Sequence, residues 1–288
     1  MRYKFLKRNT KYKFLILIAI CFLMFFNCSV TQSKGNSVLS STIDNINIPI
    51  QEHTVQSVLW QQISSEYRAL TYQAYNLAKL QLDDFTSKKG DGFQKPLAII
   101  TDIDETVLNN SPFLGKLIEL KEEFSKERWA EWGKLIEAKS IPGACEFFTY
   151  AHSRGVEVFY ISNRYESQLG ETIKNLEKVG FPNADREHVL LKTDSGEKGS
   201  RRKKVQETHN VIMLLGDNLS DFLEVFEVNS TSTRNQHTDS LKTQFGKKFI
   251  VLPNPMYGDW EGRGVYKGTY NWTSKQKDSI RRSKLISY

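Results

Sequence analysis

The sequence contains few cysteines, and their positions exclude a fold held together by disulfides. Three cysteines occur in 288 residues. Cys21 lies in an N-terminal apolar run and Cys28 follows it, which leaves Cys145 as the single thiol of the remaining chain. Because one thiol has no internal partner, the fold must rest on a hydrophobic core. A composition of 39% hydrophobic and 25% charged residues also excludes disordered and collagen-like chains.

Several common functional signatures are also missing. The sequence has no Gly-x-Ser-x-Gly elbow, no Walker loop and no dinucleotide-binding fingerprint, which argues against the enzyme classes that depend on them. Its five histidines lack metal-ligand spacing, so a zinc site is not expected. There is no internal repeat and no extended low-complexity region.

Acidic residues are absent from residues 1–13, where six Lys or Arg residues lie. The formal net charge of +7 would otherwise favour a nucleic-acid partner. Removing residues 1–27 leaves 7 − 6 = +1, so we expect no nucleic-acid partner. The apolar run, residues 14–26, is shorter than the roughly 20 residues that cross a bilayer as a helix. Residues 1–27 are therefore predicted to be a secretory signal peptide rather than a permanent transmembrane anchor.

The end of the apolar run resembles a bacterial lipoprotein signal, in which the cysteine after the run is acylated and becomes the new N-terminus. The resemblance makes Cys28 the predicted lipidation site. It implies a lipid-anchored protein of the bacterial cell envelope, in the outer membrane, facing the periplasm or the surface. The alternative is an unmodified Cys28 in an uncleaved signal. Residues 28–54 are rich in Ser, Asn and Thr and predict a flexible tether.

Short apolar runs alternate with helical segments in the rest of the chain. This alternation predicts an α/β fold with a parallel sheet flanked by helices, in which ligands bind beyond the carboxyl ends of the strands. The predicted helices include residues 146–154 and 168–179, each followed by glycine. The predicted strands are residues 97–101, 156–161, 189–191, 211–215 and 249–252.

Two further segments predict a mainly helical cap over the strand ends. From Val55, apolar residues recur at three- and four-residue steps, which predicts one long helix within residues 55–92. The second segment, residues 107–140, is too long for a plain connection between strands and contains a helical pattern. The folded domain is predicted to span residues 55–288.

Two carboxylates follow the first predicted strand. Asp102 and Asp104 are two residues apart, and alternate residues of an extended segment share a face, so both acids can converge on one point. Such a pair suits a reaction in which one carboxylate is a nucleophile or metal ligand and the other a general acid. The alternative is a solvated acidic turn that caps a helix.

A second acidic motif, Gly-Asp-x-x-x-Asp, follows the strand predicted at residues 211–215. Asp217 is placed to bind a divalent cation together with Asp102, because Mg²⁺ prefers a few carboxylates and keeps some waters. Asp221 lies one helical turn further and is expected to support the site. Helix N-capping is the alternative interpretation.

Two further segments are candidates for binding an anion. Ser162, Asn163 and Arg164 follow the strand predicted at residues 156–161 and offer a hydroxyl and backbone N–H groups near a helix start. Lys198 follows the short strand predicted at residues 189–191, although a single lysine is most simply a solvated side chain. The basic run at residues 201–204 is likewise interpreted as the solvated face of a helix.

The order of these pieces, Asp-x-Asp, Ser, Lys and Gly-Asp-x-x-x-Asp, resembles the signature motifs of the haloacid dehalogenase (HAD) superfamily. Asp104 is similar to the second acid of its phosphatases and phosphomutases. Within the superfamily the chain resembles the class C acid phosphatases, which include lipoprotein e type 5'-nucleotidases. That likeness rests on residues 71–76 (TYQAYN), 141–144 (IPGA), 162–164 (SNR), 216–222 (GDNLSDF) and 252–262 (LPNPMYGDWEG).

The resemblance implies a Rossmann-like HAD core and a role for each motif residue. Asp102 would attack phosphorus and form an aspartyl phosphate, while Asp104 would act as general acid and then general base. Ser162 and Lys198 would hold the phosphoryl oxygens, and Tyr257 would stack on a nucleobase. Asn163 and Arg164 would also bind substrate. The implied Mg²⁺ ligands are Asp102, the Asp104 carbonyl, Asp217 and Asp221.

The implied function is that of a Mg²⁺-dependent acid phosphomonoesterase, with an acidic activity optimum. Its substrates would be nucleoside 5'-monophosphates and other organic phosphomonoesters, all small molecules. Two alternatives remain: a HAD-type phosphotransferase that passes the phosphoryl group to an acceptor alcohol, and a non-catalytic surface lipoprotein that binds a ligand on the same scaffold.

Overall fold

A computed structural model describes residues 51–87 and 94–288 of the chain. The predicted signal peptide, most of the predicted tether and Cys28 lie outside the described residues, as does the end of the segment predicted at residues 55–92. The described part of the tether contains a short 3-10 helix, η1 (Glu52–Thr54). Within the described ranges, no helix is both long enough and apolar enough to cross a membrane.

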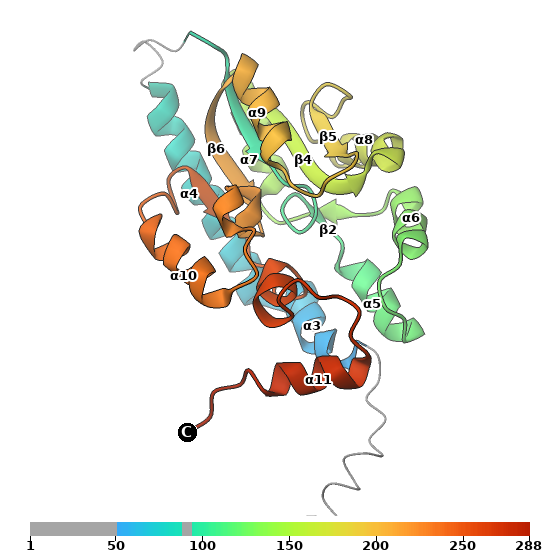
Figure 1. Cartoon of the computed structure of the whole chain (residues 1–288). Helices are drawn as coiled ribbons and strands as arrows, with labels where there is room; N and C mark the ends of the chain where they lie inside the picture. Colours follow the sequence, from blue (N-terminus) through green and yellow to red (C-terminus); the bar gives the residue numbers. More distant parts are fainter. Residues whose placement is uncertain (1–50, 88–93) are drawn as a thin grey trace, which may run out of the picture. The chain divides into compact units, whose positions relative to one another are not determined.

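Five parallel strands form the central sheet, in the order β5-β4-β1-β6-β7 (Figure 1). This confirms the predicted α/β architecture. The chain adds strands on one side of β1 and then on the other, so the carboxyl ends of β1 and β6 flank the crevice where ligands bind in such sheets. The strands are β1 (Leu97–Thr101), β4 (Glu157–Tyr165), β5 (Val189–Lys192), β6 (Asn210–Gly216) and β7 (Phe249–Val251).

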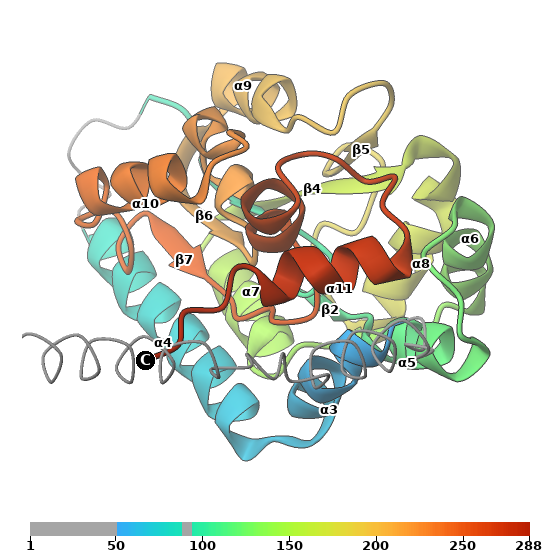
Figure 2. The same ribbon diagram turned by 60° about the horizontal axis from the view of Figure 1, so that its bottom comes forward.

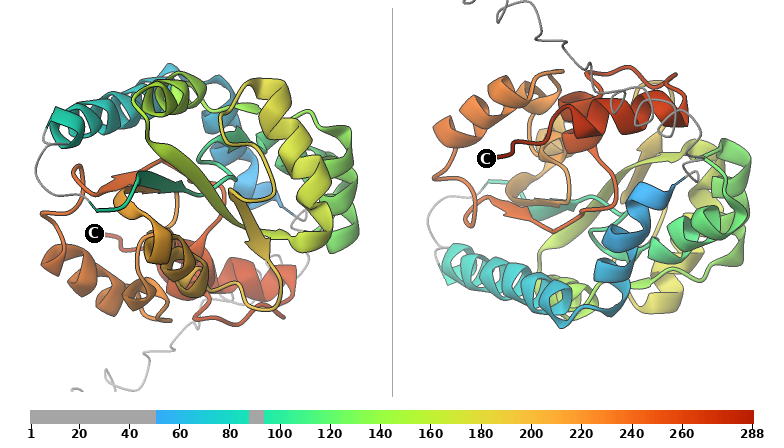
Figure 3. Two further views of the ribbon diagram at one scale, coloured as in Figure 1. Left: turned by 90° about the horizontal axis from the view of Figure 1, so that it is seen from above. Right: turned by 90° about the horizontal axis from the view of Figure 1, so that it is seen from below.

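Helices cover both faces of the sheet. Figure 3 shows α4 (Ser65–Ser87) and α7 (Ala144–Ser153) along one face and α9 (Gly199–Thr208) along the other. The helix α8 (Leu169–Val179) contributes to the same core as α4 and α7. Since both faces are covered, the central residues of the strands are mostly apolar, as in buried parallel strands, and polar residues lie towards the strand ends.

Alternate residues of β1 supply the two cores. Ile99 is buried against residues of α4 and α7, whereas Ile100 belongs to a second core that includes Val205 of α9. Every residue of β1 is buried, because successive side chains of a strand point to opposite faces and both faces of this sheet are covered.

The segment predicted as one long helix from Val55 is two helices, and this part of the cap prediction is wrong. The helix α3 (Val55–Ile63) ends at Ser64, whose backbone is extended (φ −76°, ψ 136°). The Ser64 hydroxyl accepts a hydrogen bond from the Tyr67 N–H at 3.0 Å and so begins α4. The helix α4 packs against α7 and β7 on one face of the sheet, whereas α3 packs against the insertion helix α5 (Ser111–Leu120).

The insertion after β1 is mainly helical, as predicted. It consists of α5, α6 (Lys126–Leu135) and a short antiparallel pair, β2 (Leu108–Asn109) with β3 (Lys139–Ser140). Figure 2 shows α3 beside α5, and α6 contacts α8. The other described elements are η2 (Glu166–Gln168), η3 (Leu219–Asp221), η4 (Glu224–Phe226), α10 (Thr231–Ser240), the π-helix η5 (Trp260–Val265) and α11 (Ser274–Arg282).

Candidate active site

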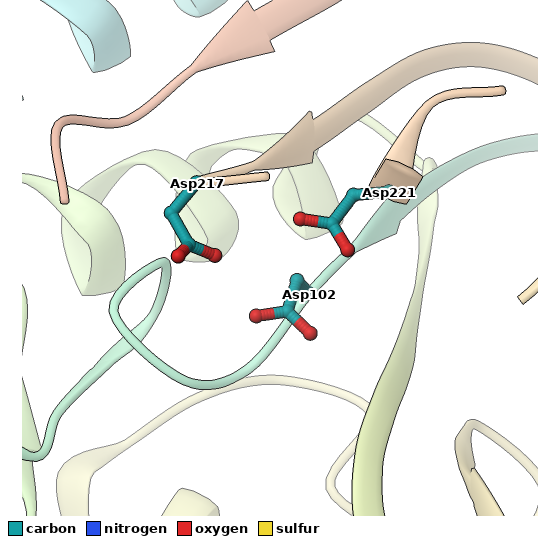
Figure 4. Close-up of side chains that lie close together, drawn as sticks. All are labelled: Asp102, Asp217 and Asp221. Atoms are coloured by element: carbon teal, nitrogen blue, oxygen red, sulfur yellow. The ribbon is translucent and has the colours of Figure 1, made fainter. Parts of the chain in front are cut away.

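Three carboxylates meet at the carboxyl ends of β1 and β6 (Figure 4). Asp102 directly follows β1, and its N–H donates to the carbonyl of Leu215 in β6 at 2.9 Å. Asp217 directly follows β6, and Asp221 is the last residue of η3. Carboxylate oxygens of these three residues lie within 4.8 Å of one another, so the sheet brings together the acids predicted from the two motifs.

The turn after β6 fixes the position of Asp221. Its Oδ2 accepts a hydrogen bond from the Asn218 N–H at 2.9 Å. A Cβ at Gly216 would clash with the Asp221 side chain, so glycine is required for this close approach. The two short-range contacts explain the spacing of the Gly-Asp-x-x-x-Asp motif.

Lys198 bridges two of the three acids. It lies at the start of α9 and is buried. Its Nζ contacts Asp102 Oδ1 and donates to Asp221 Oδ1 at 2.7 Å. Burial alone would lower the pKa of this ammonium, but the carboxylates of Asp102 and Asp221 raise it above its usual range. The lysine therefore stays charged and compensates one of the three negative charges.

Asp217 is the acid that Lys198 does not contact. Its hydrogen bonds come from neutral side chains, Asn254 Nδ2 at 2.8 Å and Thr106 Oγ1 at 3.4 Å. Burial raises the pKa of Asp217 well above its usual value, and the carboxylates of Asp221 and Asp102 raise it further. Two buried carboxylates and the half-buried Asp217, with one ammonium, leave negative charge that a divalent cation would balance, and oxygen donors are what a hard cation prefers. The residues present therefore fit a metal site.

The second motif acid, Asp104, has different surroundings. Its Oδ1 accepts hydrogen bonds from Arg164 Nη2 at 2.8 Å and Nε at 2.9 Å, and from Asn110 Nδ2 at 2.8 Å. Its Oδ2 accepts from the Ser162 hydroxyl at 3.1 Å. The side chain is 17% exposed. The Asp104 carboxylate thus belongs to a hydrogen-bonded network that is separate from the three clustered acids, and it remains accessible.

Ser162, Asn163 and Arg164 do not follow the strand, as the sequence suggested, but lie inside β4. The strand continues because Tyr165 pairs with Lys192 of β5, after a register shift that follows Ile161. The predicted strand end at residue 161 is therefore wrong, whereas η2 begins at Glu166, so the segment lies near a helix start as predicted. The Ser162 hydroxyl nevertheless reaches Asp104, and its oxygen also accepts from the Arg164 N–H at 3.1 Å.

The basic run at the start of α9 is not a solvated face in its first half, which corrects the interpretation from sequence. Arg201 donates to the Ser162 carbonyl at 2.5 Å and to Asn163 Oδ1 at 2.8 Å. Arg202 is buried and donates to the carbonyls of Ser220 and Asp221, both at 3.0 Å. These two side chains therefore connect α9 to the segment of Ser162 and Asn163 and to the turn of Ser220 and Asp221. A run of basic residues gives no indication of such long-range partners.

Two further residues of the site were not predicted, Glu105 and Asn110. Glu105 is fully buried and left-handed (φ 59°), a conformation that costs a non-glycine residue roughly 1–2 kcal/mol. Its carboxylate accepts from the Asn110 N–H at 2.7 Å and from the Tyr257 hydroxyl. Burial, together with the Asp104 charge, raises the pKa of Glu105 to about 7. The one feature of the sequence that points to Glu105 is its place as the third acidic residue of the Asp-Ile-Asp-Glu-Thr motif.

The two motif acids are therefore suited to different chemical tasks. Asp102 is buried beside an ammonium and two other acids. Burial raises the pKa of Asp102 to about 7 although the Lys198 ammonium opposes the shift, so a further cation would favour its carboxylate form. Asp104 lies among hydrogen-bond donors and is accessible, which suits a group that passes a proton to and from a reactant. Pairs of carboxyl groups with contrasting surroundings are typical of acid-base and nucleophilic catalysis.

Comparison with known proteins identifies related chains. The family described as HAD superfamily, subfamily IIIB (acid phosphatase), matches residues 25–260. The class C acid phosphatase from Bacillus anthracis is 41% identical, with a TM-score of 0.79 over 84% of this chain and 100% of that chain. A second structure of that enzyme, with tungstate bound, is 42% identical over the same shares, with the same TM-score.

More distant relatives come from plants. The stem 31 kDa glycoprotein of Glycine max is 26% identical over 161 residues, which are 54% of this chain and 57% of that protein. Acid phosphatase 1 of Solanum lycopersicum is 25% identical over 161 residues, 55% of this chain and 57% of that protein. The match thus spans little more than half the length of these two relatives.

Proposed function

This chain belongs to subfamily IIIB of the HAD superfamily, the acid phosphatases, and from this premise we propose that it is a metal-dependent phosphomonoesterase. The observation that carries the proposal is the separation of the two motif acids. Asp102 lies with Lys198 in the acidic cluster, and Asp104 lies in the network of Ser162 and Arg164. A phosphoryl transfer with an enzyme-bound intermediate needs one group for attack and another for proton transfer.

In the proposed reaction, a carboxylate oxygen of Asp102 attacks phosphorus. As this bond forms, the bond between phosphorus and the ester oxygen breaks, and Asp104 gives its proton to the departing oxygen. Asp104 then takes a proton from a water molecule that attacks the aspartyl phosphate, which releases inorganic phosphate and frees Asp102. Ser162 and Lys198 are placed next to these two acids, where they would hold phosphoryl oxygens.

We propose that the side chains of Asp102, Asp217 and Asp221 hold Mg²⁺, with the Asp104 carbonyl as a further ligand. When bound, the ion would neutralise charge on the transferring phosphoryl group. The support is the donor set itself, because one ammonium contacts only two of the three clustered carboxylates, of which Asp102 and Asp221 are buried and Asp217 is half-buried. The anionic cluster would repel a phosphate ester without a further cation.

Nucleoside 5'-monophosphates are proposed substrates, together with other organic phosphomonoesters. Tyr257 is the candidate for stacking on the base, because it is partly exposed and its hydroxyl contacts Glu105 next to the catalytic loop. Asn163 is exposed beside Ser162 and is a further candidate to contact substrate. The binding of tungstate, an oxyanion, by the Bacillus anthracis relative is consistent with a phosphate ester as ligand.

A substrate panel tests this function. Purified protein should release phosphate from p-nitrophenyl phosphate and from a nucleoside 5'-monophosphate, and chelation by EDTA should abolish both activities until Mg²⁺ is restored. An added alcohol that captures most of the phosphoryl groups would instead indicate a phosphotransferase. The absence of turnover with saturable nucleotide binding would indicate a ligand-binding protein.

We also propose that acylated Cys28 anchors the protein in the bacterial cell envelope through its lipid. The lipid would insert in the outer membrane, with the catalytic domain in the periplasm or at the surface. The support is the basic segment and apolar run that precede the cysteine. Metabolic labelling with a fatty acid should modify the native chain and not a Cys28→Ser variant. Labelling of both proteins would contradict the assignment.

A further inference from the structure

The guanidinium group of Arg164 is hydrogen-bonded to side chains within the protein. Its guanidinium is buried, with 3% of its side chain exposed. It makes a two-point contact with Asp104 Oδ1, through Nε at 2.9 Å and Nη2 at 2.8 Å, and Nη1 donates to Thr172 Oγ1 at 3.3 Å. A planar guanidinium in such a contact fixes the orientation of its carboxylate partner.

The insertion helix α6 holds this arginine and its neighbour Asn110. The ring of Trp129 lies 5.5 Å from Arg164 Cζ, a cation–π distance. One turn on, Trp132 Nε1 donates to Asn110 Oδ1 at 2.8 Å. The amide nitrogen of Asn110 in turn donates to Asp104 Oδ1 at 2.8 Å. Two tryptophans of one helix thus contact Arg164 and Asn110, two of the three side chains that donate hydrogen bonds to Asp104.

We propose that Arg164 is a positioning residue for the acid Asp104 and not a ligand of the substrate phosphate, and that α6 sets this position through Trp129 and Trp132. The inference rests on the proposed function, in which Asp104 protonates the departing oxygen. It assigns the insertion a catalytic purpose: α6 helps to direct the carboxyl group that delivers the proton.

The proposal predicts a dependence on the leaving group. β-Glycerol phosphate expels a poor alkoxide leaving group and needs the proton, whereas p-nitrophenyl phosphate expels a good one and does not. The constant kcat/KM reports steps up to the first irreversible one, which is release of the alcohol or phenol. A badly oriented acid therefore lowers kcat/KM for the alkyl ester selectively, whereas loss of a phosphate ligand lowers both constants equally.

The decisive variant is Arg164→Lys, which keeps the charge and removes the planar two-point contact. We expect kcat/KM for β-glycerol phosphate to fall by about 100-fold or more, within the range that general acid catalysis contributes, and that for p-nitrophenyl phosphate to fall by less than about tenfold. Arg128→Lys is the matched control, because Arg128 lies on α6 next to Trp129 and pairs at the surface with Glu122 and Glu131. It should change neither constant.

A milder variant guards against misfolding of Arg164→Lys. Trp132→Phe keeps an aromatic ring and removes the N–H that fixes Asn110. It should lower kcat/KM for β-glycerol phosphate relative to kcat/KM for p-nitrophenyl phosphate by about fivefold, the size of one hydrogen bond. Equal losses for both substrates, or an unchanged ratio in both variants, would overturn the inference. Failure of the native protein to hydrolyse either ester with Mg²⁺ would instead contradict the proposed function.

Discussion

Binding of Mg²⁺ to the acidic cluster should release a proton. In the metal-free protein, burial and the neighbouring acids Asp221 and Asp102 raise the pKa of Asp217 well above its usual value. Asp217 therefore holds a proton in an acidic pH range where an ordinary aspartate is ionised. Because the ion needs the carboxylate form, binding must displace this proton, and affinity should increase as pH rises towards the raised pKa of Asp217.

The size of the effect follows from the charges. The cluster has three carboxylates, and the ammonium of Lys198 compensates one of them through contacts with Asp102 and Asp221. Each proton displaced per ion gives a roughly tenfold increase in affinity per pH unit, or about 1.4 kcal/mol. Above the raised pKa of Asp217 the increase should stop, because the proton is already lost.

Calorimetric titration with Mg²⁺ measures both quantities. Titrations in buffers of different ionisation enthalpy count the released protons, and a series of pH values gives the slope. Asp217→Asn should bind Mg²⁺ more weakly at neutral pH and release about one proton fewer. Release of no proton by the native protein, or tighter Mg²⁺ binding at lower pH, would refute a protonated Asp217 in the metal-free cluster.

Two further predictions concern the substrate and the stability of the fold. Tyr257→Leu should raise KM for nucleoside monophosphates about tenfold, from lost stacking, with a smaller effect on β-glycerol phosphate in the same kinetic assay; equal effects would contradict the stacking role. At the far end of the sheet, His188 contacts Asp185 at 2.8 Å and Glu157 at 3.2 Å. Burial opposes protonation of His188, but these two carboxylates raise its pKa overall. The ion pairs therefore stabilise the folded protein fully below the pKa of His188 in the unfolded chain, and this stabilisation is lost as pH rises through its pKa in the folded protein. Glu157→Gln should therefore lower the free energy of unfolding by about 0.5–1 kcal/mol at acidic pH and by less at alkaline pH, in urea titrations; a constant difference would contradict this.

The parts of the fold that follow from local pattern were predicted. The strand at residues 97–101 was predicted with the bounds that it has, because a buried parallel strand is a short apolar run with clear ends. The positions of Asp102 and Asp217 followed from the strand ends, since parallel strands place their carboxyl ends at one edge. The break at Ser64 was missed because neither glycine nor proline marks it.

Side-chain partners distant in sequence could not be predicted. Arg164 meets Asp104 across 60 positions, and Arg201 meets Ser162 across 39. Nothing in the local pattern separates such an arginine from a solvated one, because its burial depends on packing of separate elements. The role of Asn110 likewise depends on its hydrogen bonds with Trp132 and Asp104, which the fold brings to it.

Asp102 is the proposed nucleophile, and trapping the phosphorylated intermediate tests this role most directly. Protein quenched with acid during turnover of p-nitrophenyl phosphate should carry phosphate on Asp102, located by mass spectrometry. The Asp102→Asn variant, whose amide is not a nucleophile, should carry none and should lose turnover. Phosphate on another residue, or turnover by Asp102→Asn at the native rate, would contradict the account.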